Sequence, residues 1–130
     1  ALVSGATYIA RSFSGNIPHT TRIIEEGIKH KGFSFIDHLS PCVTYNKLNT
    51  YDWFRQNIYN LEADPDYDPK DKALALKRVL ESYKVPTGLI YKEQRSTYEE
   101  LILPYTNRPI VFEDLSISSH DYFSIMDEFL

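Results

Sequence analysis

The first 40 residues contain a strand, a helix and a second strand in succession, and this unit limits the folds open to the chain. The run GATYIARS (5–12) carries β-branched and aromatic residues, which is typical of a strand. A helix is expected over 18–31, because Pro18 suits a first helical turn and Gly32 suits the position after the last one. The segment FSFIDHL (33–39) has strand length. Two parallel strands joined by a right-handed crossover are therefore predicted.

The remaining chain continues to alternate helices with strands. The expected elements are a helix in 49–62 behind Asn49 and Thr50, a helix over 70–83, a strand over 87–94, a helix after Ser96, an extended segment beyond Pro104 and a terminal helix from about Ser119. In the helix over 70–83, the side chains expected to point inward are Leu76, Val79, Leu80 and Tyr83. The alternation predicts an α/β fold with a parallel sheet and flanking helices.

The length and composition suit one domain. With 130 residues, of which 42% are hydrophobic and 25% charged, the chain can bury one core. Residues 1–130 are therefore expected to form a single domain or a fragment of a larger one, with about 104–130 as a C-terminal extension. The chain opens at Ala1, without an initiator methionine, directly before a strand. A fragment of a longer polypeptide is the expectation.

Charge and hydropathy exclude two classes of partner. Against 14 basic residues stand 18 acidic ones, and no basic run is interleaved with aromatic residues, so nucleic acid is not an expected partner. No apolar run approaches the roughly 20 residues of a membrane-spanning helix, and the N-terminus lacks the features of a signal peptide. A single cysteine also agrees with a reducing compartment. We expect a cytoplasmic protein.

Cys42, the only cysteine, comes directly after the predicted strand 33–39. Ligands and cofactors meet open α/β sheets at the carboxyl ends of the strands, which favours a functional role. Free cysteines are also often buried as small hydrophobic residues, so packing remains an alternative. A nucleophilic Cys42 would need a base, and His38 with Asp37 is the nearest candidate, although neighbouring strand residues point to opposite faces. The four histidines are too scattered to complete a metal site.

Arg11, at the end of the first predicted strand, has two possible roles. A guanidinium there could bind a substrate carboxylate through two hydrogen bonds. It could equally form an ion pair on the surface or where two protein chains meet. The sequence leaves both open.

Four strings occur in a fixed order: GATYIARSFSGN, HKGFSFIDHLSPCVTYN, TYDWFRQ and GLIYKEQRSTYEE. Together they resemble the C-terminal half of the beta subunit of 2-oxoacid:ferredoxin oxidoreductases, the family that includes pyruvate ferredoxin oxidoreductase. The resemblance covers about 6–100. It implies a thiamine diphosphate-binding α/β fold and oxidative decarboxylation of a 2-oxoacid such as pyruvate with coenzyme A. It also implies an alpha subunit as partner and ferredoxin as electron acceptor.

The resemblance further implies two cofactors. In cluster-bearing members of the family, three cysteines near the start of the beta subunit and a fourth in the Ser-Pro-Cys string hold a [4Fe–4S] cluster, which makes Cys42 the fourth ligand by similarity. The other three cysteines are absent from this sequence. The family's motifs for thiamine diphosphate and magnesium lie upstream, and Gly15-Asn16 is expected to be a plain turn. No catalytic or thiamine-binding residue is assigned here, and the chain alone is expected to be inactive.

Two other functions stay open at this point. One is a noncatalytic α/β subunit-interaction domain in which Cys42 is buried as packing. The other is a separate cysteine-dependent hydrolase or transferase that uses His38 as its base.

Overall fold

The computed structural model describes residues 1–81, 83–102, 110–112, 114 and 116–129. The chain divides into two compact units, Ala1–Thr97 and Tyr98–Leu130. The extended conformation expected beyond Pro104 falls largely outside the described residues. None of the helices in the described part of the chain is long and apolar enough to cross a membrane.

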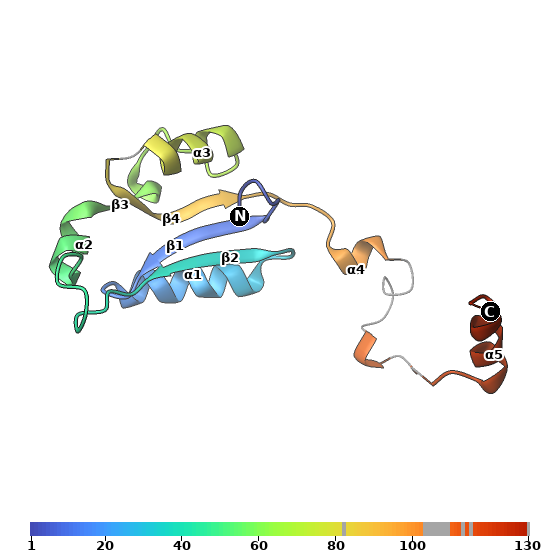
Figure 1. Cartoon of the computed structure of the whole chain (residues 1–130). Coiled ribbons are helices and arrows are strands. Elements are labelled where there is room, and N and C mark those ends of the chain that lie inside the picture. The colour runs from blue at the N-terminus through green and yellow to red at the C-terminus, as the bar shows by residue number, and fades with distance from the viewer. Residues whose placement is uncertain (82, 103–109, 113, 115, 130) are drawn as a thin grey trace. The chain divides into compact units, whose positions relative to one another are not determined.

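The first unit is a four-stranded sheet with helices (Figure 1). Its elements are β1 (Tyr8–Phe13), α1 (Ile17–Lys29), β2 (Ser34–Leu39), α2 (Tyr51–Asn57), β3 (Ile58–Asn60), the 3-10 helix η1 (Leu61–Ala63), α3 (Lys72–Glu81) and β4 (Val85–Lys92). The strand order is β2-β1-β4-β3. The α/β class with flanking helices is confirmed.

The sheet is mixed, whereas the sequence predicted a parallel sheet. Strand β2 pairs parallel to β1, which confirms the predicted crossover through α1, and β3 pairs parallel to β4. Strand β4, however, runs antiparallel to β1, with a register shift between Ile9 and Ala10. The local pattern of a short apolar run predicts the length of a strand. It does not predict whether the strand runs parallel or antiparallel, because that depends on the neighbour with which the strand pairs.

Helix α1 packs on one face of β1. Asn16 caps it by accepting a hydrogen bond from the His19 N–H at 3.2 Å. On its inner side, the hydroxyl of Tyr8 donates to the backbone carbonyl of Ile23 at 3.1 Å, and both residues are fully buried. Gly27 lets the helix approach the sheet, since a Cβ there would lie 2.9 Å from Ile36 Cδ1. The helix is therefore held by a buried polar contact as well as by apolar packing.

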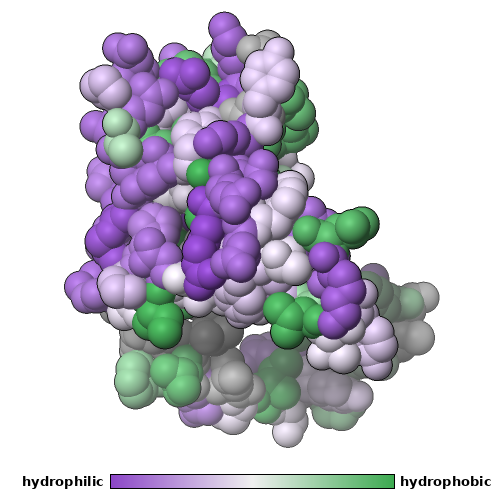
Figure 2. All heavy atoms as spheres, turned by 90° about the vertical axis from the view of Figure 1, so that its left-hand side faces the viewer, coloured by the Kyte–Doolittle hydropathy of each residue, from purple (hydrophilic) through white to green (hydrophobic). Residues whose placement is uncertain are grey.

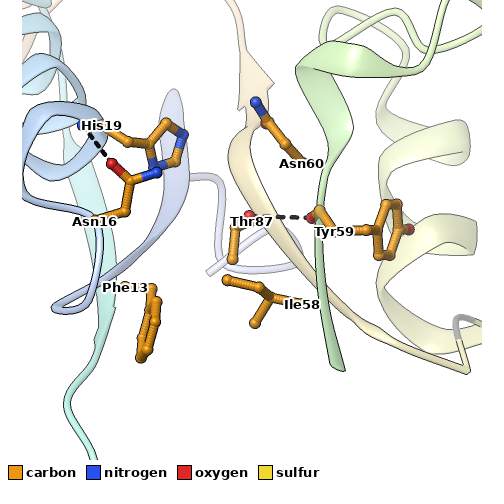
Figure 3. Close-up of a pocket in the computed structure, with 7 residues that line it drawn as sticks. All are labelled: Phe13, Asn16, His19, Ile58, Tyr59, Asn60 and Thr87. Carbon is orange, nitrogen blue, oxygen red and sulfur yellow. Dashed lines mark hydrogen bonds between the residues drawn. The ribbon is translucent and has the colours of Figure 1, made fainter. Parts of the chain in front are cut away.

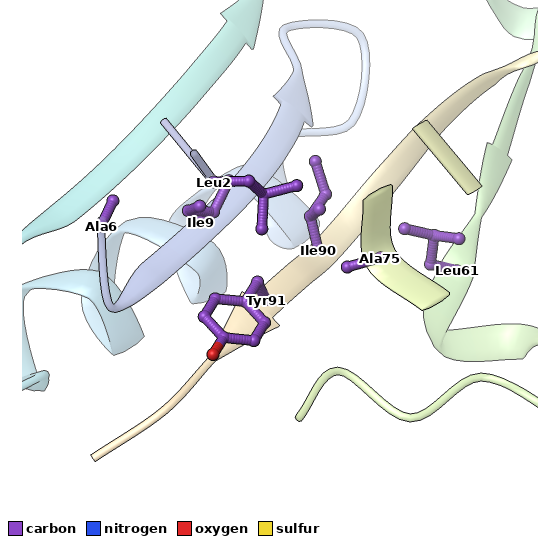
Figure 4. Close-up of a cluster of buried hydrophobic side chains, with 7 residues drawn as sticks. All are labelled: Leu2, Ala6, Ile9, Leu61, Ala75, Ile90 and Tyr91. Carbon is purple, nitrogen blue, oxygen red and sulfur yellow. The ribbon is translucent and has the colours of Figure 1, made fainter. Parts of the chain in front are cut away.

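A second cluster covers the opposite face of β1 (Figure 4). Ile9 of β1 meets Ile90 of β4, Ala75 of α3 and Leu61 of η1 there. Because consecutive strand residues point to opposite faces, Tyr8 and Ile9 belong to different clusters. Strand β1 is thus buried on both sides.

Two predicted helices differ from the observed ones. The helix expected in 49–62 ends at Asn57, because Ile58–Asn60 pairs with β4 and forms a strand. In α3 the predicted inward face is partly wrong: Val79 packs against the core, but Leu76 and Leu80 are 39% and 73% exposed. Tyr83 lies beyond the end of the helix and is fully exposed. The buried position is Ala75, a small side chain that admits close packing against β4.

In the second unit, α4 (Tyr98–Leu101) and α5 (Ser119–Asp127) confirm the two helices predicted after Ser96 and near Ser119. The Ser118 hydroxyl caps α5 by accepting from the Asp121 N–H at 3.1 Å. A 3-10 turn, Ile110–Phe112, lies between them in the chain, so the extended conformation predicted there is wrong for these three residues.

The burial pattern predicts unequal effects of two identical substitutions. Leu61→Ala removes a fully buried side chain and should lower the free energy of unfolding by about 2–5 kcal/mol. Leu80→Ala, at an exposed position on α3, should change it by less than about 0.5 kcal/mol. Urea denaturation followed by circular dichroism measures both. Equal destabilisation by the two variants would contradict the assigned helix face.

Candidate functional site

Cys42 lies in the loop after β2, at the carboxyl end of the parallel pair β1 and β2, as the sequence predicted. Its side chain is exposed, and so are all residues over 42–48. Figure 2 views this end of the first unit and shows mainly hydrophilic side chains, with apolar ones scattered among them. The alternative in which Cys42 is buried packing is therefore wrong for this chain: the loop leaves the sheet after Leu39, and nothing in the described residues covers it.

Backbone amides of the loop affect the acidity of the thiol. The N–H groups of Tyr45 and Thr44, and to a smaller extent that of Asn46, hydrogen-bond the sulfur and lower the pKa of Cys42 below its ordinary value. The loop is curled so that the Asn46 N–H also donates to the Cys42 carbonyl at 2.9 Å. A thiolate is both the stronger nucleophile and the form that binds metals. The loop thus favours the reactive form of the only cysteine.

Side chains within the loop hold this curl. The Asn46 side-chain oxygen accepts from the backbone N–H groups of Leu48 and Asn49, at 3.0 and 2.9 Å. The Lys47 ammonium donates to the Val43 carbonyl at 2.6 Å. These local bonds fix the direction of the amides without any covering structure.

His38 and Asp37 are engaged elsewhere. The His38 ring nitrogen Nδ1 lies 2.8 Å from the Ser12 hydroxyl, and Asp37 accepts from Arg11 Nε at 2.7 Å. Both pairs join residues that face each other across β1 and β2. Within the described residues, neither side chain makes a hydrogen bond to Cys42. The Cys-His-Asp arrangement needed by the hydrolase alternative is not assembled.

Arg11 takes the second of its two predicted roles. Besides Asp37, its guanidinium donates to the Pro86 carbonyl at 3.4 Å, and its side chain is largely covered. It links β1 to both neighbouring strands. A substrate carboxylate would have to displace Asp37.

Metal ligands do not accumulate around Cys42. In the described ranges, no group of three or more His, Cys, Asp or Glu side chains could hold a metal ion. Cys42 can therefore supply one ligand, and any others would come from further polypeptide.

A cavity of about 200 Å³ lies at the end of β1, between the start of α1 and the strands β3 and β4 (Figure 3). Asn16, His19 and Asn60 contribute polar groups to it, and Phe13 and Ile58 contribute apolar walls. The sequence did not predict this cavity. The cap residue Asn16 was the only local signal, and nothing in the pattern connects it with Asn60.

Comparison with known proteins gives consistent results. The family described as the C-terminal part of the pyruvate ferredoxin oxidoreductase beta subunit matches residues 42–107. A 2-oxoacid:ferredoxin oxidoreductase subunit beta from Sulfolobus is 36% identical over 113 residues, covering 78% of this chain and 37% of the relative. The 2-oxoacid:ferredoxin oxidoreductase 1, subunit beta, of Aeropyrum pernix is 38% identical over 111 residues, covering 77% of this chain and 35% of the relative. The chain thus spans little more than a third of these curated relatives.

A solved structure agrees with the sequence matches. The 2-oxoglutarate:ferredoxin oxidoreductase from Magnetococcus marinus, determined with 2-oxoglutarate, coenzyme A and succinyl-CoA bound, superimposes with a TM-score of 0.77 at 26% identity. The match covers 95% of this chain and 42% of that one. Both units of the chain therefore fall within the matched region.

The amide contacts predict an acidic thiol. In the folded chain, the rate of Cys42 alkylation by iodoacetamide should rise with pH around a midpoint below that of the chain unfolded in guanidinium, since unfolding removes the amides. Tyr45→Pro, which deletes the main N–H donor, should raise the midpoint, and Tyr45→Phe, which keeps it, should not. Identical midpoints for folded and unfolded chains would refute the assigned contacts.

Proposed function

Because the chain belongs to the family formed by the C-terminal part of pyruvate ferredoxin oxidoreductase beta subunits, we propose that it forms that part of a 2-oxoacid:ferredoxin oxidoreductase. The proposed reaction converts a 2-oxoacid such as pyruvate and coenzyme A into carbon dioxide and the acyl-CoA, and passes the released electrons to ferredoxin. The names of the curated relatives support this assignment. The proposed assembly includes an alpha subunit.

Within this assembly, we propose that Cys42 is one thiolate ligand of a [4Fe–4S] cluster. Such clusters are held by four cysteine thiolates, and when bound they supply one-electron transfer. Cys42 fits this role on three grounds: its side chain is exposed, its pKa is lowered, and it lies in a loop at the carboxyl end of β2. Since the sequence has no other cysteine, the remaining thiolates would come from polypeptide outside it.

The loop amides have a defined task in this proposal. Those of Tyr45, Thr44 and Asn46 lower the pKa of the thiol and so favour the thiolate form that binds metals. Hydrogen bonds to ligand sulfurs are also among the factors that set the reduction potential of a cluster. The chain would therefore contribute both a ligand and part of its electrostatic environment.

The residues of this chain do not fit thiamine diphosphate and magnesium. No sequence motif and no cluster of metal-ligating side chains among the described residues is available for them. We place that site in the part of the relatives that the chain does not match, and assign no catalytic residue here.

Exposed apolar side chains support packing against further subunits or segments. On β2 and just before it, Phe33 and Phe35 are 66% and 44% exposed, and Ile28 on α1 is 79% exposed. Large apolar side chains left exposed in this way are available for contacts with other polypeptide. This agrees with a role as part of a larger assembly.

The ligand assignment predicts a loss of iron. In a complete beta subunit reconstituted with iron and sulfide, Cys42→Ser should remove most of the visible absorbance and lower the bound iron, because an alcohol is a poor substitute for a thiolate. Ser40→Ala, at an exposed position in the same loop, should leave both unchanged. Undiminished absorbance and iron in Cys42→Ser would reject the assignment.

A further inference from the structure

The cavity beside α1 is built from hydrogen-bond donors, and it is independent of the cluster proposal. It measures about 200 Å³, which is room for one small organic ion. In Figure 3, His19 and Asn60 approach it from opposite sides, from α1 and β3, with side-chain nitrogens turned toward the gap. Residues 41 positions apart in sequence thus meet at one site.

Two asparagine amides are oriented by their own backbone contacts. The Asn16 side-chain oxygen accepts from the His19 N–H, and that of Asn60 accepts from the Glu62 N–H at 3.1 Å. Because each oxygen is already occupied, each amide presents its nitrogen Nδ2 as the remaining donor. No other group in the described residues accepts from either nitrogen. The amides therefore offer donors to a ligand.

His19 supplies the third group, which donates when Nε2 carries the ring proton. Its ring nitrogen Nε2 is buried and has no hydrogen-bond partner among the described residues. The nearest carboxylate oxygen, Glu62 Oε2, is 4.0 Å away and already accepts from Arg22. A buried polar atom without a partner costs free energy, and a bound group that accepts a hydrogen bond would remove that cost.

The remaining lining is apolar or already satisfied. Phe13 and Ile58 form apolar walls, and the Thr87 hydroxyl donates to the Tyr59 carbonyl at 3.0 Å. The Glu62 carboxylate pairs with Arg22, which also pairs with Glu26, and it further accepts from the Leu89 N–H. The cavity also lies at the start of α1, where the helix dipole is positive. The free amide donors and the positive end of the helix suit a ligand that carries acceptor oxygens, whereas the Glu62 carboxylate opposes it.

We propose that this cavity binds an oxyanion, a carboxylate or phosphate group of a small molecule, through His19 Nε2 and the Nδ2 atoms of Asn16 and Asn60. Phe13 and Ile58 supply the apolar part of the lining, while Asn16 and Asn60 are exposed to solvent. The proposal does not depend on Cys42 or on the oxidoreductase assignment.

The test is a titration of the whole chain, with inorganic phosphate and 2-oxoglutarate added in separate experiments. Binding is followed by the ring ¹⁵N and ¹H shifts of His19 in the NMR spectrum, with His19→Gln used to assign them. We expect a saturable shift with at least one of the two anions. Asn60→Asp keeps the oxygen that accepts from Glu62 but replaces the donor with a negative charge, so it should weaken binding about tenfold or more.

Gln56→Glu is the matched control, since it makes the same amide-to-carboxylate change on the exposed side of α2, and binding should be unchanged. Saturation by phosphate alone would identify phosphate esters as the ligand class, and saturation by 2-oxoglutarate alone would identify carboxylates. The proposal is overturned if neither anion gives a saturable shift of His19, or if Asn60→Asp binds as tightly as the unchanged chain.

Discussion

The pairing of β1 on both of its edges is the contact on which the rest of the first unit depends. Strand β2 runs parallel along one edge, and β4 runs antiparallel along the other. Both faces of β1 are buried as well, one by Ile23 of α1 and the other by the cluster around Ile9. A strand surrounded in this way cannot shift its register by one residue without exchanging its two faces, so its position fixes the elements around it.

That fixed position explains why two different sites lie at one end of the sheet. Phe13 and Leu39 are register partners at the ends of β1 and β2. From Leu39 the chain enters the loop of Cys42, and from Phe13 it turns into α1 and the cavity containing His19. Both sites therefore lie at this end of the sheet because the segments that form them begin where β1 and β2 end. The carboxyl end of parallel strands is the usual location of ligands in α/β proteins for this geometric reason.

The sequence predicted those features that depend on local pattern. Residues 5–39 show strand and helix signals with a proline and a glycine at the boundaries, and the observed β1, α1 and β2 follow them closely. The three-residue strand Ile58–Asn60 and the antiparallel direction of β4 depend on partners distant in sequence, and no local pattern encodes them. The position of Cys42 in a loop could be predicted from the strand pattern of β2, which ends just before it. Its exposure and its contacts with backbone amides could be seen only in the folded structure. The meeting of Asn16 with Asn60 had no sequence signal.

A metal-binding thiolate needs two separate things, a fixed orientation and protection from water. The loop of Cys42 supplies the first, because the side chain of Asn46 and the ammonium of Lys47 bond to its backbone, and its amides lower the pKa of the thiol. It does not supply the second, since the residues from Cys42 to Leu48 are exposed. A fixed orientation can be encoded within a few residues of one loop. Protection from water requires a larger body of polypeptide. An oriented but uncovered thiol thus agrees with the proposed role of Cys42 as one ligand of a cluster whose other ligands come from further polypeptide.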